Sequence, residues 1–261
     1  MSISDKLIAL SRHTESTLCP PFEWCHIPGG AVTLLDASGY GGTTGGDYQV
    51  ADFAIAKYLV TNAQYQKFIE HPNGFCNPQW WDFSPQGIQW RKDHRSPKPT
   101  AFAGADLPCT RVSWFDSVAF CRWLATELNI HVRLPTEQEW QRAAGGDTGW
   151  SYPWGNELDD TRANFAKRLG KVSAVGSFPD GQSPFGVMDM IGNLWEWCLT
   201  TWGTDGTDLN GYTYRVYRGG AWNVSNPEYL TAIDRGVGWS PRGRLNDCGL
   251  RIAIQLNIFV E

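Results

Sequence analysis

The 261-residue sequence has no long run of apolar residues. A helix that crosses a bilayer needs about 20 predominantly apolar residues, and charged residues or prolines interrupt the apolar stretches of this chain sooner. Residues 1–20 also lack a basic stretch followed by an apolar run, the pattern of a secretory leader. The sequence therefore predicts no membrane span and no secretion signal, and it indicates no location other than the cytoplasm.

Charge is also scarce, and basic charge in particular. Charged residues make up 19% of the chain and its formal net charge is -5. The few basic clusters are short and mixed with acids, so they produce no positive field that would attract a phosphate backbone. We therefore do not expect nucleic acid as a partner.

The seven cysteines form no CxxC pair. Because they are odd in number and Cys121 and Cys198 lie in apolar surroundings, we expect reduced, buried thiols. A disulfide between two of them stays open, since pairing depends on a geometry that the sequence does not give.

Aromatic residues and glycine are abundant. The chain contains 14 Trp, 12 Phe, 9 Tyr and 28 Gly, which is typical of a loop-rich domain held together by aromatic packing. Residues 80–108 show no period but carry interleaved aromatics, so we expect an ordered loop there. The length is compatible with one domain around one core.

Three helices are predicted by their caps. Gln64, Asp116 and Glu139 lie three positions after Thr61, Ser113 and Thr136, respectively. This spacing is the pattern of a capping box. The helices then cover residues 62–70, 114–128 and 137–144, and capping with the helix dipole accounts for Glu137 and Glu139. Short strands are expected at 53–58, 194–199, 214–218 and 249–256. These elements together indicate an α+β fold with little regular structure.

Several segments, in this order, resemble the formylglycine-generating enzyme (sulfatase-modifying factor) family. They are 27–30 (IPGG), 58–65 (YLVTNAQY), 108–124 (PCTRVSWFDSVAFCRWL), 132–140 (VRLPTEQEW), 152–156 (YPWGN), 189–197 (DMIGNLWEW), 218–222 (RGGAW) and 249–251 (GLR). The resemblance implies a variant of the C-type lectin fold, with both ends of the domain in one small sheet. We expect an N-terminal extension over residues 1–24, a single domain over 25–261 and an exposed face built from C-terminal loops.

Glu196 lies between Trp195 and Trp197 and needs a cation, because a lone buried carboxylate is costly. One interpretation is an ion pair with Arg218 or Arg251. The other follows from the resemblance, which implies a structural Ca²⁺ site with oxygen ligands. Its ligands on matching positions are the side chains of Asp189 and Glu196 and the carbonyls of Gly192 and Leu194.

The chemistry of the family's enzymes is missing. The resemblance places the oxidase's two copper-binding cysteines, counted from Gly219 and Gly220, at Val224 and Tyr229. Neither side chain is a thiol, and Cu(I) requires soft ligands. The five histidines form no HxxxH or HxE arrangement that matches the iron site of the related sulfoxide synthases. We therefore expect no copper, no iron and no catalytic residue.

What remains is a binding face over residues 221–247. Framework residues alternate there with a mixed set rich in Tyr, Trp and Arg, residue types that are enriched in binding hot spots. The expected ligand is a protein or another macromolecule. The candidate binding residues are Asn223, Val224, Ser225, Tyr229, Thr231, Ile233, Asp234, Gly236, Val237, Trp239, Arg242, Arg244 and Leu245.

Non-catalytic members of the family resemble the prokaryotic variable proteins of diversity-generating retroelements, whose C-terminal segment is varied at AAC codons. Among the candidate residues only Trp239 lies outside the set that such codons can yield. The first hypothesis is therefore a diversified binder. Two alternatives stay open, an undiversified accessory domain and an enzyme of altered chemistry with polar groups near Tyr229, Asp234, Arg235 and Arg244.

Overall fold

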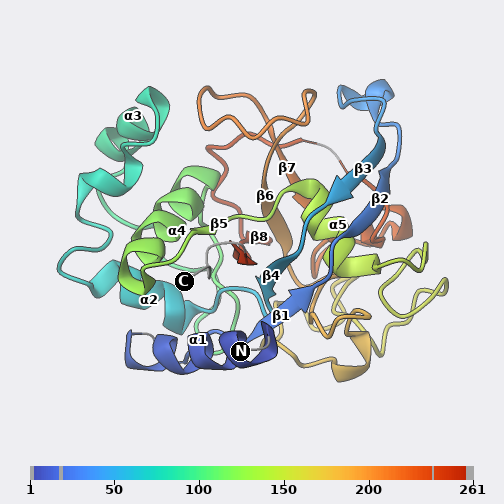
Figure 1. Ribbon diagram of the computed structural model, residues 1–261. Helices are drawn as coiled ribbons and strands as arrows, with labels where there is room; N and C mark the ends of the chain where they lie inside the picture. The colour runs from blue at the N-terminus through green and yellow to red at the C-terminus, as the bar shows by residue number, and fades with distance from the viewer. Residues whose placement is uncertain (1–2, 18–19, 237, 257–261) are drawn as a thin grey trace.

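A computed structural model describes residues 3–17, 20–236 and 238–256 (Figure 1). Its helices are α1 (Ile3–Thr17), α2 (Asn62–Glu70), α3 (Pro85–Asp93), α4 (Trp114–Leu128) and α5 (Glu137–Gly145). Short 3₁₀ turns occur at η1 (Ser38–Tyr40), η2 (Pro78–Trp81), η3 (Pro179–Gly181) and η4 (Pro227–Leu230). The strands are β1 (Trp24–Ile27), β2 (Gly30–Leu34), β3 (Gly46–Val50), β4 (Phe53–Ala56), β5 (Val132–Arg133), β6 (Trp195–Thr201), β7 (Arg215–Arg218), β8 (Cys248–Gly249) and β9 (Ala253–Gln255).

The three predicted helices are confirmed, and their caps explain where they begin. The hydroxyls of Thr61, Ser113 and Thr136 each accept the backbone N–H three residues later, and the reciprocal side-chain bond is present in all three. This satisfies donors at the first turn that would otherwise lack a partner. Helix α4 then ends at Leu128 and is capped by Asn129, whose φ of 51° is left-handed.

Three small sheets carry the strands. The first has the order β1-β4-β9-β5, the second is the β2-β3 hairpin, and the third has the order β7-β6-β8. Strands β1 and β9 come from opposite ends of the described chain and flank β4, which confirms the expected joining of the two ends of the domain. The four predicted strands appear as β4, β6, β7 and the pair β8 and β9, while β1, β2, β3 and β5 were missed.

Strand β6 lies between two hydrophobic cores. Trp195 and Trp197 pack on the core around α2 and α4, whereas Cys198 belongs to the core around α5 and the β2-β3 hairpin. This follows from the alternation of side chains along a strand. In Figure 1, α2, α3 and α4 lie in one half of the molecule and α5, β2 and β3 lie in the other.

Two helices were not predicted. Helix α3 lies in the stretch expected to be loop; Ser84 caps it, Pro85 occupies its first turn, and only Gly87 and Trp90 are buried along it. Helix α1 falls in the expected N-terminal extension and contributes Leu7 and Leu10 to the main core. Helix α3 lacks an extended apolar face, so tertiary contacts position it, whereas Ile3, Leu7 and Leu10 of α1 follow a helical period on the side that meets the core.

No helix among the described residues has the length and apolarity to cross a membrane. The six cysteines within the described ranges are free. Cys109, Cys121, Cys198 and Cys248 are buried, as expected for structural thiols, while Cys76 is exposed. Cys19 lies outside the described residues.

Candidate functional site

A buried carboxylate anchors the C-terminal segment to helix α5. Glu137 accepts bonds from Arg218 Nη1 at 2.8 Å, Arg235 Nε at 3.0 Å and Arg235 Nη2 at 2.7 Å. All three side chains are almost fully buried. The sequence assigned Glu137 to the helix cap and dipole alone, which was incomplete: Glu139 makes the cap, and Glu137 points inward to the two arginines.

The same network reaches the first hairpin. Arg235 Nη2 donates to Asp205 Oδ1 at 2.7 Å, and Asp205 Oδ2 accepts from the hydroxyls of Tyr48 at 2.8 Å and Thr43 at 2.6 Å. Arg235 is therefore shared between two carboxylates beneath the surface and is not free to meet a ligand. Segments that are distant in the sequence are held in one arrangement by these charge-assisted bonds.

A second buried ion pair neutralises Glu196. Arg251 donates to both carboxylate oxygens, from Nε at 2.9 Å and from Nη2 at 2.7 Å, and Trp140 Nε1 donates at 3.0 Å. Arg251 also donates to the carbonyls of Ala56 and Lys57. Of the two arginines that the sequence left open as partners of Glu196, the structure shows Arg251. Arg218 lies over the Trp140 ring instead, 4.9 Å from its centroid.

The residues expected to hold Ca²⁺ do not fit as a complete set. Both oxygens of Glu196 are already engaged by a cation, and no group of three or more His, Cys, Asp or Glu side chains is placed to hold a metal in the described ranges. Asp189 is the exception, since none of the described cationic side chains pairs with its carboxylate, which accepts one bond, from Gly176 N–H at 2.8 Å. Burial raises the pKa of Asp189 to about 6. Gly192 and Leu194, the expected carbonyl ligands, are also buried and follow Asp189 by three and five residues.

The candidate binding residues do not form one surface. Three of them, Tyr229, Asp234 and Gly236, line a cleft of about 290 Å³. The opposite wall comes from residues that the sequence did not indicate, including Leu35, Asp36 and Tyr40. Tyr40 is 77% exposed and Tyr229 is 44% exposed, so two aromatic rings stand at this cleft.

Further candidate residues lie close to that cleft or outside it. Ile233 lines a neighbouring cleft of about 450 Å³ together with Leu35 and Trp150. Thr231 accepts the backbone N–H of Asp234 at 2.9 Å and so shapes the turn between the two clefts. Leu35 belongs to both clefts, which makes them one continuous region of the surface.

A separate exposed group lies further along the segment. Trp239 is 41% exposed, and its backbone pairs with that of Arg215. Arg242 is exposed and places its guanidinium 3.9 Å from the centroid of the Tyr212 ring, a cation–π contact. Ser225 is exposed as well, on the loop before η4.

The remaining candidates serve as anchors. Arg244 makes two bonds to the buried Asp116, at 2.8 and 2.9 Å, which attaches the segment to the first turn of α4. Asn223 donates to Asp247 at 3.0 Å. Val224 and Leu245 pack against the cores. Val237 lies outside the described residues.

The structure places the two side chains at the positions where the resemblance puts the oxidase's thiols. Val224 packs against a core and Tyr229 stands at the cleft. Burial raises the pKa of Cys109, Cys121, Cys198 and Cys248, so these thiols stay protonated at neutral pH. Protonated thiols are poor nucleophiles.

Comparison with known proteins supports the resemblance that the sequence motifs indicate. The model of the sulfatase-modifying factor enzyme 1-like domain matches residues 14–256. The inactive C-alpha-formylglycine-generating enzyme 2 of Mus musculus is 30% identical over 87% of this chain and 84% of its own length. The hercynine oxygenase of Mycobacterium tuberculosis is 33% identical over 78% of this chain, which spans only 53% of that enzyme.

A solved structure shows the fold. The Treponema denticola variable protein 1 superposes with a TM-score of 0.66, at 22% identity, over 89% of this chain and 95% of its own. The predicted α+β fold of the C-type lectin-like, formylglycine-generating enzyme type is confirmed.

Replacing Asp189 with Asn tests whether a cation acts at this buried carboxylate. The folded pKa of about 6 lies above the ordinary 3.8, so the fold binds this proton more tightly than the unfolded chain does. Stability therefore falls as the pH rises from about 4 to about 6. Without a metal, Asp189→Asn removes this penalty and should raise the free energy of unfolding at pH 7 by up to about 3 kcal/mol, with no gain below pH 4.

The measurement is urea denaturation of both proteins between pH 3.5 and 7.5, with and without EDTA. Asn retains an acceptor for Gly176 and tolerates the left-handed backbone at this position, where φ is 57°. A bound Ca²⁺ would reverse the result: the variant would be less stable at pH 7, and EDTA would destabilise the wild type alone.

Proposed function

Because the chain belongs to the family of the sulfatase-modifying factor enzyme 1-like domain, we propose that it is a ligand-binding member that does not carry out the family's oxidation. The observation that supports this most directly is the pair Val224 and Tyr229 at the positions where the resemblance places the copper-binding cysteines. The oxidase needs two thiolates there to hold Cu(I). An apolar side chain and a phenol cannot replace them.

The proposed binding surface is the two-cleft region with the exposed part of the segment 221–247. Tyr40, Tyr229 and Trp239 offer exposed aromatic area, and Asp234 and Arg242 offer charged groups beside it. Aromatic and arginine side chains supply much of the energy at protein interfaces. The buried network of Glu137, Arg218 and Arg235 fixes the backbone below, so that little entropy is lost when a ligand binds.

One relative supports a non-catalytic role, and another supports the alternative that the chain is an enzyme. The mouse relative that covers most of this chain is named as inactive, whereas the relative from Mycobacterium tuberculosis is named as an oxygenase. An enzyme of altered chemistry is the second candidate. The cleft residues Asp234 and Tyr229 favour it only weakly, because Arg235 and Arg244, the expected cationic groups, are engaged with buried carboxylates.

A turnover assay tests the absence of oxidase activity. The purified chain, loaded with Cu(I) under reducing conditions and supplied with oxygen, should leave a cysteine-containing sulfatase peptide unchanged in mass. An active formylglycine-generating enzyme assayed in parallel should convert the peptide and serves as the positive control. Formylglycine formed above the rate of copper alone would refute the proposal.

The origin of the segment is tested in the genome. A diversified binder requires a nearby reverse transcriptase gene and a near-copy of the DNA that encodes residues 221–247. The two copies should differ mainly at adenines, and the differences should fall on outward positions such as Ser225, Tyr229 and Arg242. A genome without such a repeat would contradict diversification and leave the undiversified binding domain.

A further inference from the structure

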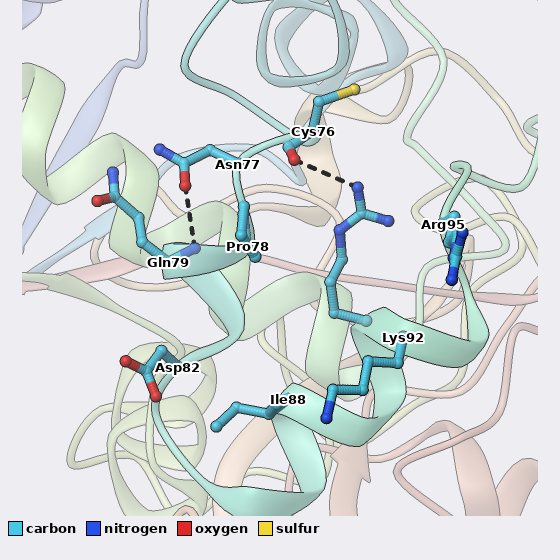
Figure 2. A pocket seen from close by; sticks show the side chains of 9 residues that line it. Cys76, Asn77, Pro78, Gln79, Asp82, Ile88, Lys92 and Arg95 are labelled. Carbon is cyan, nitrogen blue, oxygen red and sulfur yellow. Dashed lines mark hydrogen bonds between the residues drawn. The ribbon is translucent and has the colours of Figure 1, made fainter.

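A pocket of about 620 Å³ lies between η2 and α3, on residues that the proposed binding surface does not use. Figure 2 shows Pro78 and Asp82 on one side and Ile88, Lys92 and Arg95 on the other, with Cys76 at the top of the view. This volume is within the range of pockets that bind small organic molecules. Ile88 is 38% exposed there, an uncovered apolar side chain on a helix with few buried residues.

The pocket is positively charged although the chain as a whole is negative. Arg91, Lys92 and Arg95 line it, against one acidic lining residue, Asp82. None of the three cations has a carboxylate within ion-pair distance among the residues that the structure describes. By contrast, the buried Arg218, Arg235 and Arg251 and the partly buried Arg244 each pair with a carboxylate.

Arg91 is the fixed member of this group. Its guanidinium lies over the rings of Phe75 and Trp81, 5.0 and 5.1 Å from their centroids, and donates to the carbonyls of His94 and Cys76. Its Nε is buried without a partner. Burial lowers the pKa of Arg91, and the charge of Arg95 acts in the same direction. Cations of like charge held around one cavity are a cost that an anion would relieve.

We propose that this pocket binds a small organic anion, with its oxyanion group between Arg91, Lys92 and Arg95 and its apolar body on Pro78 and Ile88. Guanidinium groups pair well with the planar geometry of a carboxylate and equally with phosphate. Carboxylates and phosphate esters both carry such an oxyanion group, and titration calorimetry distinguishes them. The pocket is too small for a nucleic-acid backbone, which would need a continued basic track.

Titration calorimetry with three probes of the same apolar body tests the site. Benzoate and phenyl phosphate carry the anion, and benzyl alcohol lacks it. We expect saturable binding of at least one of the anions, weakened by raising the salt concentration, and no detectable binding of benzyl alcohol. The tighter of the two anions identifies the preferred head group.

Three variants in the pocket and one control outside it show where the anion binds. Arg95→Gln and Lys92→Gln change exposed side chains and should leave the melting curve unchanged, while each raises the Kd of the bound anion about fivefold. Lys171→Gln removes one exposed charge outside the pocket and should leave the Kd unchanged. Ile88→Ser should weaken the binding of benzoate and phenyl phosphate. Inorganic phosphate, which has no apolar body, is a fourth probe and should bind Ile88→Ser and the wild type equally.

Two results would overturn the proposal. One is the absence of saturable binding by both anions at millimolar concentration. The other is a loss of affinity that is equal in Arg95→Gln and Lys171→Gln, because that would indicate net charge rather than the pocket. Neither result bears on the proposed binding surface, which shares no residue with this pocket.

Discussion

The carboxylate of Glu137 is the group on which the arrangement of the C-terminal half depends. It is buried at the start of α5 and accepts bonds from Arg218, at the end of β7, and from Arg235, in the middle of the candidate binding segment. A buried charge of this kind is tolerated only with well-placed partners, and a substitution that leaves a buried charge without compensation costs about 3–5 kcal/mol. The segment between the two arginines is therefore fixed at its base.

Trp140 keeps this network apart from the second one. Its ring lies below the Arg218 guanidinium, and its N–H donates to Glu196, which pairs with Arg251. Glu196 and Arg218 are register partners on neighbouring strands, yet each pairs with a different residue because the indole stands between them. Two charge pairs thus coexist in one core, with each charge satisfied by separate groups. The two groups of buried charges thus hold in place the backbone beneath the proposed binding surface.

The features that the sequence predicted well are those with local causes. The capping boxes at Thr61, Ser113 and Thr136 fixed three helix starts, because the bonds involved span three residues. Helix α3 was missed because only two of its residues are buried and its place depends on Trp90 packing against the rest of the fold. Local patterns do not contain such contacts.

The candidate site was predictable only in part for the same reason. Tyr229 and Asp234 were identified from their segment, but the wall formed by Leu35 and Tyr40 comes from almost 200 residues earlier in the chain. The choice of Arg251 for Glu196, and the use of Arg244 as an anchor on Asp116, also depend on tertiary packing.

The central claim is that a buried ionic frame supports a surface that is free to vary for binding. Saturation mutagenesis with a protease-resistance readout of folding tests it most directly. We expect Ser225, Tyr229, Trp239 and Arg242 to accept nearly every amino acid, with stability changes within about 0.5 kcal/mol, and Glu137, Arg218 and Arg235 to accept almost none. If the outward positions were as intolerant as the buried arginines, the segment would be part of the framework and the account would be contradicted.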